Sequence, residues 1–146
     1  MRPTGMETAE RPPGGRLRSM LAPAGVAAVA AAGFAYVGVV DPNQPGHYPV
    51  CPFFAVTGFY CPGCGTLRAV HALGHADVLG SLGSNPLTVA MIPFVVFLWA
   101  RWAARSWNGR PMRTSLARPG YLWGLLAIMI VFWVVRNTPF GHSLAP

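Results

Sequence analysis

The three cysteines of this 146-residue chain lie in one short stretch, CPFFAVTGFYCPGC, which runs from Cys51 to Cys64. Cys61 and Cys64 form a Cys-Pro-Gly-Cys motif, and Cys51 lies upstream of it. Thiols that are gathered in this way suit three kinds of chemistry: a structural disulfide, a metal site, or thiol–disulfide exchange. The residues leave all three open.

A metal site would use the three thiols with either His71 or His75, which gives the Cys3His ligand set that zinc accepts in tetrahedral sites. Zinc is therefore the candidate cofactor. A structural disulfide would instead join Cys51 with Cys61 or Cys64 and tie down a loop. In thiol–disulfide exchange, Cys64 would be the activated thiol, Cys61 its resolving partner, and Cys51 would pass the electrons on.

The residues that follow the motif add polar groups that a helix would gather. In a helix that begins near the motif, one stripe would hold a thiol, a guanidinium and two imidazoles. These residues are Cys64, Arg68, His71 and His75, at spacings of four, three and four. The stripe would turn them toward a common volume.

Arg68 also suggests an anion site. Together with Arg136 and Asn137 it could line a site for an anionic headgroup or phosphate, which guanidinium groups bind bidentately. The alternative for the two arginines is an ion pair with Asp41 or Asp77, or extension of the side chain to lipid phosphate.

The sequence does not identify an enzyme. It contains no GxSxG, HExxH or P-loop motif. With two aspartates and two glutamates in the whole chain, catalysis by paired carboxylates is disfavoured. We expect a structural or binding module, with a disulfide staple or a zinc knuckle. The alternative is a membrane thiol–disulfide oxidoreductase that uses Cys61 and Cys64.

The overall composition indicates a membrane protein. Hydrophobic residues make up 53% of the chain and charged residues 10%, whereas an ordinary soluble domain has about 25% charged residues. The net charge of +7 comes from arginines that flank the apolar runs, so we expect no nucleic-acid partner. The expected partner is the lipid bilayer, with an anionic lipid headgroup or another membrane protein as further candidates.

The apolar runs define the expected architecture. Three of them predict transmembrane helices at about 21–40, 86–105 and 120–137. A short amphipathic helix at about 66–77 follows the CPGCG loop and should lie at the interface or re-enter the membrane. The fold class is therefore all-α, a polytopic helical membrane protein. Residues 1–19 are expected to be a flexible basic tail and residues 20–146 a single membrane domain. A cleavable signal peptide is the alternative for the first run.

Arginines set the expected orientation. They are concentrated before the first apolar run and between the last two, and such an excess marks the cytoplasmic side. We therefore predict a multi-pass protein of the bacterial plasma membrane with a cytoplasmic N-terminus. The cysteine loop and the C-terminus would be extracytoplasmic.

Several short motifs together resemble a known family. They are Cys51-Pro52, the CPGCG block, Arg68, Asn85-Pro86-Leu87 and Arg136-Asn137. This combination is similar to that of a family of small bacterial membrane proteins, known as domain of unknown function twenty-seven fifty-two. Family members read Thr-Arg one residue after CPGCG, whereas here Leu67 separates Thr66 from the arginine. The resemblance implies an integral membrane protein and implies no particular chemistry.

Overall fold

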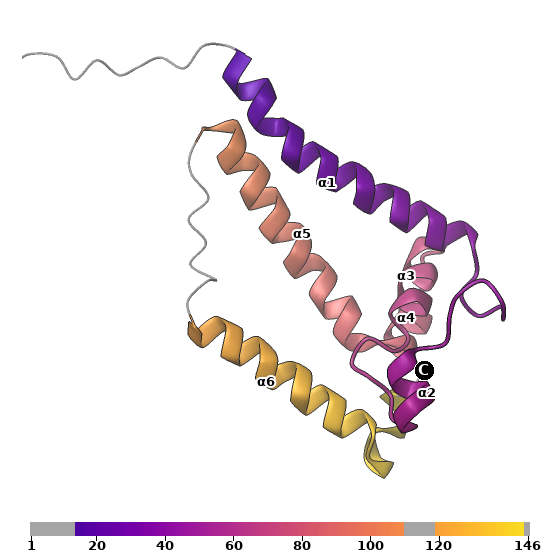
Figure 1. The fold of residues 1–146 in the computed structure, drawn as a ribbon. Helices are drawn as coiled ribbons and strands as arrows, with labels where there is room; N and C mark the ends of the chain where they lie inside the picture. Colours follow the sequence, from indigo (N-terminus) through magenta and orange to yellow (C-terminus); the bar gives the residue numbers. More distant parts are fainter. Residues whose placement is uncertain (1–13, 110–118, 145–146) are drawn as a thin grey trace, which may run out of the picture.

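The computed structural model describes residues 14–109 and 119–144, and the regular elements of this part of the chain are all helices, as predicted (Figure 1). The long helices are α1 (Gly14–Val39), α5 (Pro86–Trp107) and α6 (Pro119–Arg136). The short ones are α2 (Pro52–Thr57), α3 (Thr66–Gly74), α4 (Val78–Ser84) and the 3-10 helix η2 (Pro139–Leu144). Most of the predicted basic tail and of the basic loop before α6 lies outside the described residues.

The three long helices have the length and apolar composition that a membrane crossing requires. Their large apolar side chains are mostly exposed, for example Leu21 at 69% and Val131 at 61%. A surface of this kind is stable when lipid covers it, and not in water. The chain is therefore a helical membrane protein with three candidate spans, as predicted.

Helix α5 runs beside α1 in the opposite direction and lies between α1 and α6 (Figure 1). Two side chains join the first pair: Ser19 Oγ donates to the carbonyl of Ser106 at 2.8 Å, and Trp99 Nε1 donates to the carbonyl of Pro23 at 3.1 Å. The short helices gather where α1 ends, α5 begins and α6 ends. The end of α1, the start of α5 and the end of α6 therefore lie toward the same end of the molecule as the cysteine segment.

Two predicted boundaries are wrong. Residues 14–19, predicted as tail, belong to α1, because charged residues such as Arg16 end the apolar run without ending the helix. The helix predicted at 66–77 ends at Gly74, and Ala76 has a left-handed φ of 59°. Asp77 was expected near the end of that helix, but it caps the start of α4, where its side chain accepts from the N–H of Gly80 at 2.8 Å.

Helix α2 was not predicted, although its sequence carries both end signals. Pro52 stands at the first helical position, where its missing N–H needs no partner. Gly58 ends the helix with a φ of 72°, which a residue with a side chain rarely adopts. The six-residue length left no hydrophobic period from which to predict the helix.

Candidate metal centre

The sulfur atoms of the three cysteines form one cluster. The Sγ atoms of Cys61 and Cys64 are 3.1 Å apart, and those of Cys51 and Cys61 are 3.6 Å apart. All three sulfur atoms lie within 4.8 Å of one another. The cysteines are free and partly exposed. The structure thus brings together the three thiols that the sequence singled out.

Two short segments present these thiols. Cys51 is the residue before α2, so Pro52 fixes the direction in which the helix leaves it. Cys61 and Cys64 lie on a tight turn in which the N–H of Cys64 donates to the carbonyl of Cys61 at 3.1 Å. The motif therefore folds so that its two thiols point into the same space.

Cys64 does not belong to the polar stripe that the sequence predicted. Gly65 has a φ of 85° and precedes the first residue of α3, so the chain changes direction between Cys64 and the helix. The spacing of four residues between Cys64 and Arg68 therefore does not place their side chains on one face of a helix. The stripe within α3 begins after the cysteine turn.

Asn85 holds the turn from the start of α5. This side chain is fully buried. Its oxygen accepts from the N–H of Thr88 at 3.0 Å and caps the helix. Its nitrogen donates to the carbonyls of Pro62 at 2.9 Å and Cys64 at 3.1 Å. Asparagine followed by proline is a common start of a helix, whereas the sequence held no signal for the second role.

Arg136 holds the same turn from the end of α6. Its side chain is 1% exposed. One terminal nitrogen donates to the carbonyls of Cys61 at 3.0 Å and Cys64 at 3.1 Å, and the other donates to the carbonyl of Leu144 at 2.9 Å. The guanidinium also lies over the ring of Phe132, 5.1 Å from its centroid.

Asn137 and a set of aromatic rings complete the surroundings of the turn. The side-chain amide of Asn137 pairs with the main chain of Tyr60. The ring of Tyr60 stacks on Phe54 with centroids 4.8 Å apart, and Phe53 meets Trp133 edge to face at 5.9 Å. Helix α2 is thereby packed against both the turn and α6.

The local environment separates two of the thiols by their pKa. The backbone N–H of Phe54 lowers the pKa of Cys51 below its ordinary value of 9.0. Burial raises the pKa of Cys64 to about 12, and the neighbouring thiol of Cys61 adds to the increase. The thiol expected to be activated for exchange therefore has a raised pKa and resists losing its proton.

The two histidines proposed as metal ligands lie elsewhere. His71 Nδ1 is 2.8 Å from the carbonyl of Val37, and its Nε2 is 3.7 Å from a carboxylate oxygen of Asp41. The ring of His75 lies against that of His71, with centroids 4.4 Å apart. Among the side chains that the structure describes, no imidazole or carboxylate joins the sulfur cluster.

The two arginines of the predicted anion site differ in their surroundings. Arg68 is exposed, whereas Arg136 is buried and donates to main-chain carbonyls. Neither of them makes an ion pair with Asp41 or Asp77, since the one ion pair among the described residues joins His71 to Asp41. This placement gives the anion site no support.

An apolar groove opens beside the cysteine turn. Pro62, Gly63 and Thr66 line its end at the turn, and residues of α5 and α6 such as Met91 and Leu125 line the rest. The hydroxyl groups of Thr66 and Thr88 are 2.9 Å apart at this end. The groove lies between two candidate spans, where lipid chains would reach it.

These features define a class of protein: a helical membrane protein with three candidate spans and with three thiols gathered on a turn that is held by the start of α5 and the end of α6. Residues 51–99 match the family model described as "Protein of unknown function (DUF2752)". The match confirms the resemblance predicted from the CPGCG block, and it spans all three cysteines and Asn85. No curated protein and no solved structure matches the chain.

Proposed function

We propose that this protein is a membrane-embedded metal-binding module that holds one zinc ion on Cys51, Cys61 and Cys64. The observation that carries the proposal is the convergence of three sulfur atoms within 4.8 Å of one another. A disulfide needs two sulfurs and would leave the third without a task. Thiolates are the ligands that zinc and other soft metal ions prefer.

The sulfur separations suit a tetrahedral zinc site. Zinc–sulfur bonds of about 2.3 Å place the sulfurs of such a site about 3.8 Å apart. The separation of 3.6 Å between Cys51 and Cys61 is close to this value, and that of 3.1 Å between Cys61 and Cys64 needs only a small opening of the turn. The fourth position would be open to water or to a ligand from a partner.

Zinc in this position would act as a structural link. Cys51 directly precedes α2, whereas the other two thiols lie on the turn that Asn85 and Arg136 attach to α5 and α6. One ion would therefore join α2 to the start of α5 and the end of α6. Metal binding of this kind adds directly to the folding free energy.

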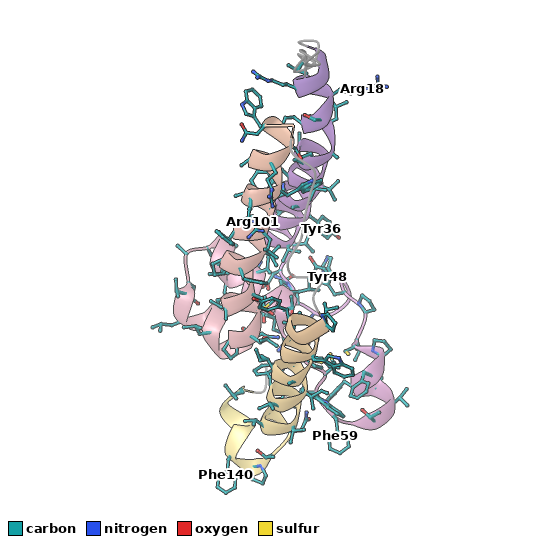
Figure 2. The ribbon with its side chains drawn as sticks, turned by 90° about the vertical axis from the view of Figure 1, so that its left-hand side faces the viewer. Arg18, Tyr36, Tyr48, Phe59, Arg101 and Phe140 are labelled. Atoms are coloured by element: carbon teal, nitrogen blue, oxygen red, sulfur yellow. The ribbon has the colours of Figure 1, made fainter. Side chains whose placement is uncertain are left out.

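The cluster faces the extracytoplasmic side of a bacterial plasma membrane in this proposal, and the bilayer is the main partner. The placement of the arginines supports this orientation. Four of them lie in the halves of α1 and α5 that are remote from the cysteines: Arg16, Arg18, Arg101 and Arg105. Figure 2 shows Arg18 at one end of the molecule and Phe59 and Phe140 at the other. A positive end is retained in the cytoplasm.

The test is the metal content of the full chain, purified in detergent without chelators and analysed by elemental mass spectrometry. We expect about one zinc per chain, and loss of zinc in Cys51→Ser, Cys61→Ser and Cys64→Ser. His71→Ala is the matched control and should keep the metal, because its ring is turned toward α1. A metal-free protein with one permanently oxidised pair would show a disulfide staple and overturn the proposal.

The same preparation tests the redox alternative. A Cys61–Cys64 pair that cycles between reduced and oxidised forms in intact cells, trapped with a membrane-impermeant alkylating reagent, would indicate thiol–disulfide exchange and contradict the zinc module. The reagent also reports the side of the membrane. Labelling of metal-depleted protein from outside the cell is the expected result, and labelling only after cell lysis would overturn the orientation.

A further inference from the structure

Arg136 carries a charge that no described carboxylate neutralises. Of the four acidic residues, Glu7 and Glu10 lie outside the described residues. Asp77 caps α4, and Asp41 lies against Asn43 and His71. The guanidinium is nevertheless 1% exposed, and its Nε has no hydrogen-bond partner.

A buried and unpaired charge is unusual because removal from water is costly. Main-chain carbonyls and the ring of Phe132 offset part of that cost through their dipoles and π-electrons. They do not supply a full negative charge. The buried guanidinium of Arg136 therefore points to an anionic partner close to it.

The cysteine turn is where this anion would form. One nitrogen of Arg136 donates to the carbonyls of both Cys61 and Cys64, so the guanidinium lies beside both cysteines. When a divalent ion binds, the three thiols release three protons to solvent. Three thiolates and one divalent ion then carry a single net negative charge.

We propose that Arg136 is the built-in counter-charge of a three-thiolate site for a divalent metal ion. This inference rests on the proposed zinc site. It adds two points: the bound ion is divalent, and Arg136, which is not a ligand, balances the charge of the site. The positive charge of the guanidinium and the single negative charge of the metal-loaded cluster sum to zero. A monovalent ion on the same thiolates would leave the centre negative even with Arg136 present. The neutral combination therefore requires a divalent ion.

The experiment measures the affinity of the full chain in detergent for Zn²⁺, by competition with a chelator of known affinity. Arg136→Gln removes the charge and keeps hydrogen-bond donors. It should weaken zinc binding by about 10- to 100-fold, as loss of a group beyond the ligand set typically does. Arg136→Lys keeps the charge and should remain within a few-fold of the native affinity. Arg68→Gln removes an exposed arginine and should change nothing.

A merely structural role predicts a different pattern. If Arg136 only braced the turn, Arg136→Gln would lower the melting temperature of the metal-free and zinc-loaded forms equally. A counter-charge predicts that the zinc-induced rise in melting temperature becomes smaller in this variant, since metal and charge are coupled. Equal losses in both forms, or equal zinc binding by native protein and Arg136→Gln, would overturn the inference.

The outcomes also separate this inference from the proposed function. If the native chain binds no zinc, the zinc site itself is wrong. If the native chain and Arg136→Gln bind zinc equally, the site stands and only the counter-charge fails. Should Arg136→Gln not fold, Arg136→Lys decides: a loss of zinc affinity beyond tenfold would show that the charge is not what the site needs.

Discussion

The side-chain amide of Asn137 pairs with both main-chain groups of Tyr60. Its oxygen accepts from the N–H of Tyr60 at 2.9 Å, and its nitrogen donates to the carbonyl of Tyr60 at 2.9 Å. The pair of hydrogen bonds has the pattern of two opposite residues in an antiparallel sheet, except that one partner here is a side-chain amide. It attaches the residue before the cysteine turn to the residue after α6.

Asn137→Ala should therefore destabilise the fold. The substitution leaves a donor and an acceptor of Tyr60 without partners in a half-buried position, which costs about 1–3 kcal/mol. Denaturant or thermal unfolding in detergent measures this loss. Asn108→Ala is the matched control, because Asn108 follows α5 and its exposed amide donates to Ala104. We expect less than about 0.5 kcal/mol for the control, and equal losses would contradict the bracing role.

Asn85→Asp should separate the two roles of that residue. Aspartate caps a helix as well as asparagine does, so the bond to Thr88 should remain. The second oxygen would then face the carbonyls of Pro62 and Cys64, which now accept from Asn85. We expect a loss of about 2–3 kcal/mol in unfolding free energy, which follows from a buried polar group without a partner, together with weaker zinc binding.

The control for Asn85→Asp is the reverse exchange at another helix start. Asp77→Asn keeps the bond to Gly80 at the start of α4, and its side chain braces no other segment in the described structure. It should change the unfolding free energy by less than about 0.5 kcal/mol. A large effect of Asp77→Asn with a small effect of Asn85→Asp would refute this account of the cysteine turn.

The thiols of the reduced, metal-free protein should react in a fixed order. The N–H of Phe54 lowers the pKa of Cys51, so this thiol has the larger thiolate fraction near neutral pH. Burial raises the pKa of Cys64 to about 12, so its alkylation rate should still be rising well above pH 9. Peptide mass spectrometry after timed iodoacetamide treatment gives the order. In denatured protein the difference should vanish, and faster reaction at Cys64 in the folded protein would contradict the assignment.

Alkaline conditions should destabilise the metal-free fold through Cys64. Its folded-state pKa of about 12 is above the ordinary thiol value of 9.0, so the folded state binds its proton more tightly than the unfolded state. The resulting stability is present below pH 9 and is lost as the pH rises toward 12. Melting temperatures from about pH 8 to pH 11 should fall more steeply for the native chain than for Cys64→Ser.

Cys51→Ser is the control for the alkaline loss. The folded-state pKa of Cys51 is lowered, so its ionisation stabilises the fold as the pH rises through that value. Removal of this thiol should therefore leave the steep alkaline loss in place. An equally shallow pH dependence for Cys51→Ser and Cys64→Ser would refute the assignment of the loss to Cys64.

Much of the architecture could be read from the chain because hydrophobicity acts locally. Runs of apolar residues as long as the bilayer is thick predict spans, and α1, α5 and α6 cover the three predicted runs. The short helices were harder, since α2 and α4 have six and seven residues and little periodicity. Asp77 was predicted to end the helix before it, whereas it caps the start of α4. A capping residue lies close in sequence to both neighbouring helices, so its position alone does not show which helix it serves.

The sequence by itself determined the membrane class of the protein and the residues with metal-binding chemistry. Both follow from composition and from the thiols of a short segment. Only the tertiary structure decided that Cys51 meets the CPGC turn, that His71 turns to α1, and that Arg136 is buried against that turn. The contacts of His71 and Arg136 join residues that are far apart in the chain. The geometry of all three depends on how the elements pack, which no local pattern specifies.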